Sequence, residues 1–101
     1  YDGLLLGGAC FTGAMAKRIF DLTRAGNTDE AGRIQESMNQ LMYTVFGGKD
    51  ITCWLSGQKQ MMVELGVFST SNTIINFPLT PECAEAIKSA CRDYLRELKP
   101  Y

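Results

Sequence analysis

The stretch YDGLLLGGACFTG, residues 1–13, decides how the fold of this chain is interpreted. Leu4–Leu6 form a continuous apolar run, and Gly7 and Gly8 follow it directly. A run that is apolar at every position is typical of a strand buried on both faces, as in a parallel sheet. Parallel strands need crossover connections, and the remaining residues offer no second convincing strand. We therefore expect this run to be the last strand of a larger α/β structure.

Four amphipathic helices are predicted after this strand, because apolar side chains recur there at the intervals of one helix face. The second pattern is the strongest, since Asn27 precedes it as a cap and Glu30 follows three positions later. Thr80 and Pro81 mark the start of the last pattern in a similar way. The predicted helices cover Gly13–Ala25, Thr28–Phe46, Ser56–Leu65 and Pro81–Leu98.

The segment 67–79 is predicted to be an extended, partly buried connection. Thr73, Ile74 and Ile75 carry the β-branched side chains that strands favour. Pro78 argues against a central strand, because proline has no N–H group to donate to a neighbouring strand.

Charge and hydropathy exclude several classes of partner. The net charge of −1 on 101 residues gives no general attraction to nucleic acid or to anionic lipid. No apolar stretch approaches the roughly 20 residues of a membrane-spanning helix. We therefore expect no nucleic-acid partner and no membrane partner.

The four cysteines, at positions 10, 53, 83 and 91, show no CxxC spacing, and the chain has no histidine. The absence of histidine excludes Ser-His and Cys-His catalysis and histidine-containing metal sites within these residues. Cys83 and Cys91 lie two turns apart on one predicted helix, about 12 Å along its axis, which is too far for a disulfide. We expect buried, reduced thiols in a cytoplasmic protein, with no disulfide, no metal and no cofactor.

The glycine pair at 7 and 8 is the candidate ligand contact. A strand end that leads into a helix can present backbone N–H groups to an anion. Alternatively, Gly7 and Gly8 let the chain turn tightly or pack closely.

Lys17 and Lys59 are the two candidates for a Schiff-base nucleophile. Such a lysine must lie in a desolvated site or near other cations, so that its amine is neutral enough to attack. Lys59 lies in a Gln-Lys-Gln stretch, and Lys17 precedes Arg18 on a polar face. Both lysines are therefore interpreted as solvated surface charges.

Four motifs in order carry a resemblance to a known family. They are DGLLLGGA, RIFDLTRAGNTDEAGRIQESMNQLM, QKQMMVELG with Lys59 seven residues ahead of Gly66, and FPLTPE. Together they resemble the C-terminal part of the dihydrodipicolinate synthase/N-acetylneuraminate lyase family of class I aldolases. The similarity spans essentially the whole chain.

The resemblance implies an α/β fold that is mostly helical within this stretch. Residues 1–26 would be the last strand and helix of a TIM barrel, and residues 27–101 the family's three C-terminal helices. A complete barrel usually needs about 250 residues, so the first seven β/α units would lie outside this stretch. That N-terminal barrel portion is thus an expected partner.

The resemblance also implies an activity. Enzymes of this family are lyases that cleave or form a carbon–carbon bond next to a 2-oxo acid, pyruvate, through a lysine Schiff base. No catalytic residue can be carried over, because the family's lysine and tyrosine lie on earlier strands. Only Gly7 and Gly8 are expected to face the substrate. We expect a homo-oligomer, a tetramer or dimer, and no catalysis by the 101 residues alone.

A different class of function stays open. The chain could be a free-standing, non-catalytic helical interaction module whose strand docks on a partner's sheet. A module of that kind should be monomeric and unfold cooperatively, whereas a part of a larger enzyme should expose large apolar faces.

Overall fold

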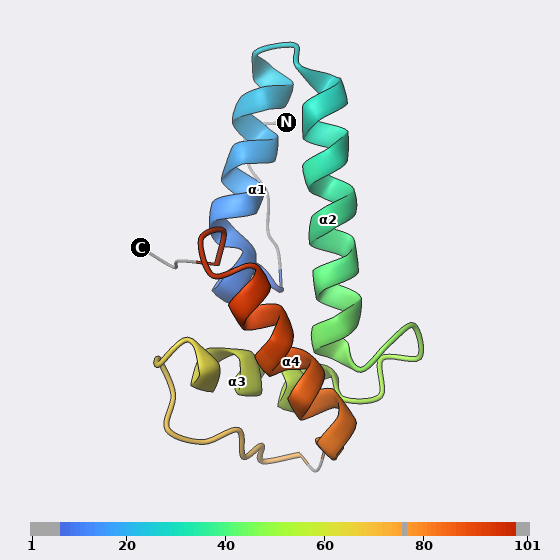
Figure 1. The fold of residues 1–101 in the computed structure, drawn as a ribbon, viewed down its shortest axis with the longest axis vertical. Helices are drawn as coiled ribbons and strands as arrows, with labels where there is room; N and C mark the ends of the chain where they lie inside the picture. Colours follow the sequence, from blue (N-terminus) through green and yellow to red (C-terminus); the bar gives the residue numbers. More distant parts are fainter. Residues whose placement is uncertain (1–6, 76, 99–101) are drawn as a thin grey trace.

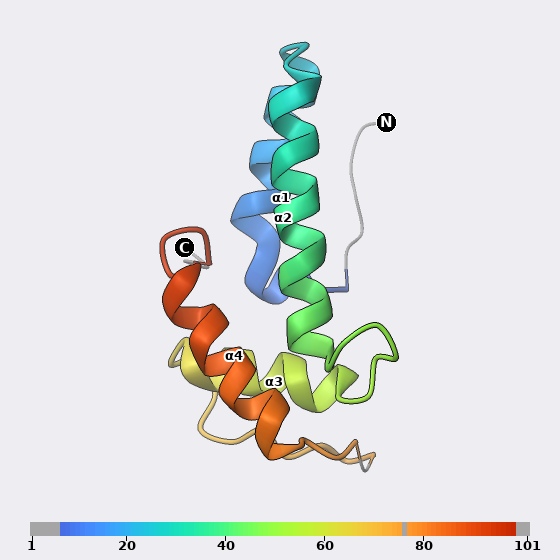
Figure 2. The same cartoon turned by 45° about the vertical axis from the view of Figure 1, so that its right-hand side comes forward.

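The structure is a computed structural model that describes residues 7–75 and 77–98. It contains the helices α1 (Ala9–Arg24), α2 (Thr28–Phe46), α3 (Trp54–Glu64) and α4 (Pro81–Asp93) (Figure 1). The first two helices form a long antiparallel hairpin (Figure 1). Helices α3 and α4 pack against the end of this hairpin at which α2 finishes, as both views show (Figures 1 and 2).

The expected α/β fold, with a strand and helix of a TIM barrel, is wrong for the part of the chain that the structure describes. Residues 7–75 and 77–98 form four helices and contain no strand. The physical reason lies in the packing, because the four helices cover one another's apolar faces and need no sheet to do so. The strand expected at Leu4–Leu6 lies outside the described residues.

The turn between α1 and α2 follows the prediction closely. Gly26 adopts a left-handed backbone conformation with φ of +80°, which is the usual conformation of a glycine just after a helix. The Asn27 side chain accepts a hydrogen bond from the backbone N–H of Glu30 at 3.4 Å. Helix α2 then runs to Phe46 as predicted, and Gly47 ends it with φ of +86°.

Other helix ends differ from their predicted positions, and α1 ends at Arg24, one residue before the predicted Ala25. Helix α1 begins at Ala9 rather than Gly13, because the Gly8 carbonyl already accepts the first helical hydrogen bond, from the Thr12 N–H at 3.2 Å, and a second bond from Thr12 Oγ1 at 2.9 Å. Helix α3 begins at Trp54 instead of Ser56 and ends one residue before the predicted Leu65.

The end of α4 shows why its length was overestimated. The helix was predicted to reach Leu98 but ends at Asp93, and Tyr94 leaves the helical conformation. The chain then turns, and the Leu98 N–H donates to the Tyr94 carbonyl at 2.9 Å. This turn returns the Leu98 side chain to the core, where it is 0% exposed. An apolar residue can therefore keep the helical spacing of the sequence after the helix itself has ended.

One apolar core joins all four helices. Helix α3 crosses the end of α2 so closely that a Cβ atom at Gly57 would overlap the carbonyl oxygen of Val45. The glycine thus permits the contact between these two helices. The core consists of Phe11, Met15, Met38, Leu41, Val45, Cys53, Met61, Met62, Cys83, Ile87, Ala90, Cys91 and Leu98.

The connection from α3 to α4 has no regular structure in its described part, residues 67–75 and 77–80. Lys59 Nζ on α3 donates a hydrogen bond to the Asn72 carbonyl at 2.6 Å and so ties the connection to the helix. The prediction of partial burial is wrong for Ile74 and Ile75, which are 104% and 66% exposed. Phe77 packs edge-on against Trp54, with the ring centres 5.5 Å apart.

Candidate functional site

The glycine pair lies at the start of α1. Gly7 is exposed, and a Cβ atom there would meet nothing within 4 Å. Gly8 is buried, and a Cβ atom there would lie 2.6 Å from Met42 Sδ on α2. Both the sulfur and the methyl group belong to the flexible end of the Met42 side chain, which can move aside, so this contact does not by itself require a glycine. Contact of Gly7 or Gly8 with a substrate stays a prediction.

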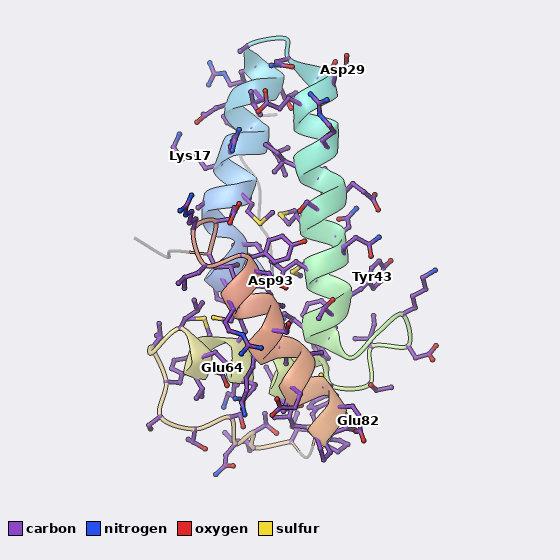
Figure 3. All side chains as sticks on the ribbon, in the orientation of Figure 1. Lys17, Asp29, Tyr43, Glu64, Glu82 and Asp93 are labelled. Carbon is purple, nitrogen blue, oxygen red and sulfur yellow. The ribbon has the colours of Figure 1, made fainter. Side chains whose placement is uncertain are left out.

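The two lysines considered as nucleophiles lie apart from each other. Lys17 points away from the helical hairpin, forms an ion pair with Asp21 one turn later, and has 74% of its side chain exposed (Figure 3). Lys59 is bound to the Asn72 carbonyl. Lys17 is paired with an exposed carboxylate and Lys59 with a backbone carbonyl, so neither environment resembles the desolvated site of a nucleophilic lysine.

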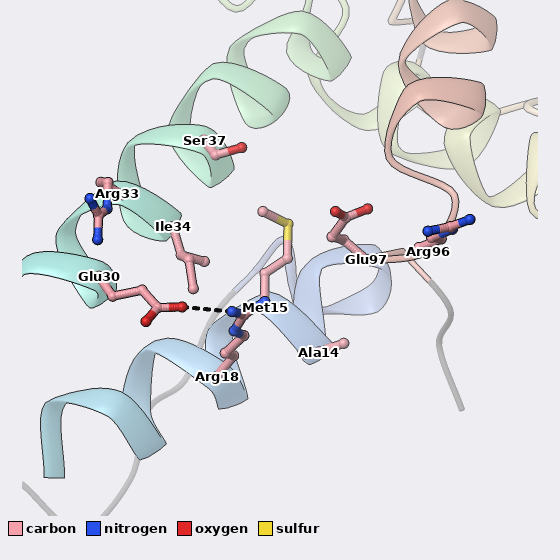
Figure 4. A pocket seen from close by; sticks show the side chains of 9 residues that line it. All are labelled: Ala14, Met15, Arg18, Glu30, Arg33, Ile34, Ser37, Arg96 and Glu97. Atoms are coloured by element: carbon pink, nitrogen blue, oxygen red, sulfur yellow. Dashed lines mark hydrogen bonds and ion pairs between the residues drawn. The ribbon is translucent and has the colours of Figure 1, made fainter. Parts of the chain in front are cut away.

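A cavity of about 560 Å³ lies between α1, α2 and the turn that follows α4 (Figure 4). Met15 and Ile34 give it an apolar wall where α1 and α2 face each other. Ser37 lies further along α2. The lining residues are Ala14, Met15, Arg18, Glu30, Arg33, Ile34, Ser37, Arg96 and Glu97.

Charged side chains surround this cavity. Arg18 on α1 and Glu30 on α2 form an ion pair of 2.7 Å across its mouth (Figure 4). Arg33 and Arg96 add two guanidinium groups, and Glu97 adds one carboxylate. The lining thus carries one positive charge more than negative, which suits a small anion. An exposed pair such as Arg18–Glu30 contributes only about 0.2–1 kcal/mol, so a ligand could displace it at low cost.

Sequence reasoning missed this cavity, although part of its signal was present. Glu30, Arg33, Ile34 and Ser37 follow the three- and four-residue spacing of one helix face. That spacing shows that they lie side by side on α2. It gives no indication that the turn around Arg96, more than fifty positions away, faces them.

Two buried thiols form a second cluster, at the end of the hairpin where α2 finishes. Cys53 is the residue before α3, and Cys83 lies in the first turn of α4. Their exposed fractions are 0% and 7%. The Cys53 N–H donates to the Phe46 carbonyl at 2.8 Å, and Cys83 Sγ lies 3.9 Å from the Val45 carbonyl oxygen. The same turn of α2 therefore positions both residues.

Hydrogen bonds make these two thiols chemically different. Burial alone would raise the pKa of Cys53, but donors from the Thr80 backbone, Cys83, Thr52 and the Thr80 hydroxyl together lower that pKa. Burial, the hydrogen bond to Cys53 and the charge of Cys53 raise the pKa of Cys83 to about 12. Cys53 is thus the thiol that more readily becomes a thiolate, and Cys83 keeps its proton.

The sequence gives no signal for this thiol pair, because spacing motifs such as CxxC apply only to cysteines that lie close together in the chain. All four cysteines are free thiols. Within residues 7–75 and 77–98, His, Cys, Asp and Glu side chains form no group of three or more suited to a metal ion. In the same residues, no helix combines the length and the apolar character needed to cross a membrane.

Comparisons with protein-family models, with curated proteins and with solved structures find no match for this chain.

Proposed function

We propose that this chain is the non-catalytic helical part of a lyase that cleaves or forms a carbon–carbon bond next to a 2-oxo acid such as pyruvate. The observation that carries the proposal is the coincidence of the family-like motifs with helix ends. The Ala-Gly-Asn motif makes the α1–α2 turn at Gly26, Gly66 follows the end of α3, and Thr80-Pro81 opens α4.

Carbon–carbon cleavage next to a ketone needs an electron sink, and in this proposal a lysine imine outside the 101 residues supplies it. The positions of Lys17 and Lys59 support a catalytic lysine outside these residues. Lys17 forms an exposed ion pair, and Lys59 holds the connection before α4. Each lysine has a structural partner, and these partners lie on different elements of the fold.

The helical part would provide contact surface to the catalytic part and to other copies in a homo-oligomer. Phe68, Ile74 and Ile75 support this role, since the three apolar side chains are exposed on one connection. A cytoplasmic location is part of the proposal and is supported by the four free thiols, which persist in reducing compartments.

The test uses the natural protein that contains this chain, incubated with pyruvate and sodium borohydride, which reduces an imine to a stable amine. Peptide mapping by mass spectrometry should then locate the adduct. We expect an adduct on a lysine outside the 101 residues and none on Lys17 or Lys59. A Lys17→Arg, Lys59→Arg double variant is the matched control and should form the adduct in unchanged yield.

An adduct on either lysine, or no adduct anywhere, would refute the lyase proposal. The second outcome would favour the other candidate function, a non-catalytic helical interaction module. The exposed Ile74 and Ile75 support that candidate as well. The exposed surface therefore does not distinguish the two functions, whereas the imine test does.

A further inference from the structure

The cavity between α1, α2 and the turn after α4 has the size and lining of a small-molecule site. Its volume of about 560 Å³ falls within the range of about 300–1,000 Å³ that such sites occupy. Met15 and Ile34 form its apolar wall, and Arg18 and Glu30 bring a cation and an anion to its mouth (Figure 4). An apolar wall beside a few charged groups is the usual composition of a site for an organic ion.

We propose that this cavity binds a small organic carboxylate, whose apolar body lies on this wall and whose carboxylate replaces Glu30 on Arg18. The sign of the ligand follows from the lining, which carries three guanidinium groups against two carboxylates. Within residues 7–75 and 77–98, no ion pair involves the other two guanidinium groups, those of Arg33 and Arg96. The proposal is independent of the lyase function, because the whole lining belongs to this chain.

The ion pair at the cavity mouth can be exchanged for a ligand without leaving Glu30 unsupported. Arg18 on α1 donates to Glu30 Oε1 on α2 at 2.7 Å, and the Arg18 side chain is 62% exposed. The second oxygen of the same carboxylate, Oε2, accepts from Asn27 Nδ2 at 3.3 Å. Glu30 also lies in the first turn of α2, where the helix dipole stabilises negative charge. Glu30 therefore keeps two sources of stabilisation when a ligand binds Arg18.

Two features select an organic carboxylate over an inorganic anion. The partner that Arg18 already holds is itself a carboxylate, so a ligand with the same group matches the position of Glu30. An inorganic anion would leave the half-buried Ile34 side chain uncovered, whereas the apolar body of an organic ligand removes its surface from water. The charge thus fixes the orientation of the ligand, and the apolar wall adds affinity.

The experiment titrates the natural protein that contains this chain with three probes, followed by saturation-transfer NMR. Benzoate combines a carboxylate with an apolar ring. Benzamide has nearly the same shape without the charge, and acetate has the charge with almost no apolar body. We expect saturable binding of benzoate, about fivefold or more tighter than that of either other probe, because only benzoate meets both the guanidinium and the wall.

Two variants locate the site, and a third is the matched control. Arg18→Gln removes the guanidinium and should weaken benzoate binding about fivefold or more, since hydrogen bonds to charged groups are the strong ones. Glu30→Gln removes the competing carboxylate, and glutamine also serves a capping box, so benzoate should bind more tightly by up to about fivefold. Lys17→Gln removes a positive charge next to Arg18 in the chain, but this side chain points away from the hairpin and should not affect binding.

Several outcomes would overturn the proposal. Equal binding of benzoate and benzamide would show that charge plays no part in recognition. Equal weakening by Arg18→Gln and Lys17→Gln would show a general charge effect, and unchanged binding in both cavity variants would place benzoate elsewhere in the natural protein. The absence of saturable benzoate binding would also refute the site. The borohydride adduct with pyruvate is a separate measurement, so failure here and failure of the lyase proposal are distinguishable.

Discussion

Replacing Gly57 by alanine should destabilise the protein, although alanine is the better helix former. Gly57 lies inside α3, where the exchange would stabilise an isolated helix by about 1 kcal/mol. In the folded protein, however, the new Cβ atom would overlap the Val45 carbonyl oxygen and lie 3.0 Å from the carbonyl carbon. Both atoms are backbone, so the contact can be relieved only by moving α3 away from α2.

The size of the effect follows from these opposing contributions. Overpacking of a core typically costs about 1–3 kcal/mol, and a clash with backbone belongs at the upper end of that range. After subtraction of the gain in helix propensity, about 2 kcal/mol of destabilisation remains. For a domain of this size that corresponds to a fall in Tm of about 8–16 °C.

The measurement is thermal unfolding followed by circular dichroism, with Gly32→Ala as the matched control. Gly32 lies inside α2, is exposed, and would place its new Cβ atom in open space. This control should raise stability by about 0.5–1 kcal/mol. A Gly57→Ala protein that melts at or above the wild-type temperature, beside a stabilised Gly32→Ala protein, would refute the close approach of α3 to α2.

Three further predictions concern the core, the thiol pair and the exposed connection. Ile87→Ala should lower the free energy of unfolding by about 2–5 kcal/mol in urea titrations, because the Ile87 side chain is fully buried in the core. A loss below about 1 kcal/mol would contradict this position in the core. Between pH 9 and 12 the native state keeps the Cys83 proton that the unfolded thiol loses, so the free energy of unfolding should fall as pH rises. The Cys83→Ala variant, titrated beside the wild-type protein, should show a smaller fall in the free energy of unfolding. Ile74→Ser with Ile75→Ser should change stability by no more than about 0.5 kcal/mol but weaken self-association in sedimentation velocity; unchanged association would remove this connection from the proposed contact surface.

Local sequence signals predicted the helix ends that side chains or glycines fix. Asn27 and Gly47 bound α2 where expected, and Thr80 accepts from the Cys83 N–H at 3.2 Å at the start of α4. The ends that failed lack such signals. Gly8 precedes α1 without a side-chain cap, and Leu98 continues the apolar spacing after α4 has ended.

The candidate sites could be predicted much less well, because they depend on contacts between distant segments. The cavity near Arg96 and the Cys53–Cys83 pair both join residues that no spacing rule compares. The overall class was wrong for a related reason. It rested on Leu4–Leu6, outside the described residues, and on a resemblance, whereas the described chain buries its apolar faces between helices alone.

The contact between Trp54 and Phe77 gives this protein an optical reporter. Trp54 is the single tryptophan of the chain, is half exposed, and packs at a right angle to the Phe77 ring. Its emission wavelength depends on how much water reaches the indole. Tryptophan fluorescence can therefore follow, without any label and in real time, the release of the connection before α4 from α3.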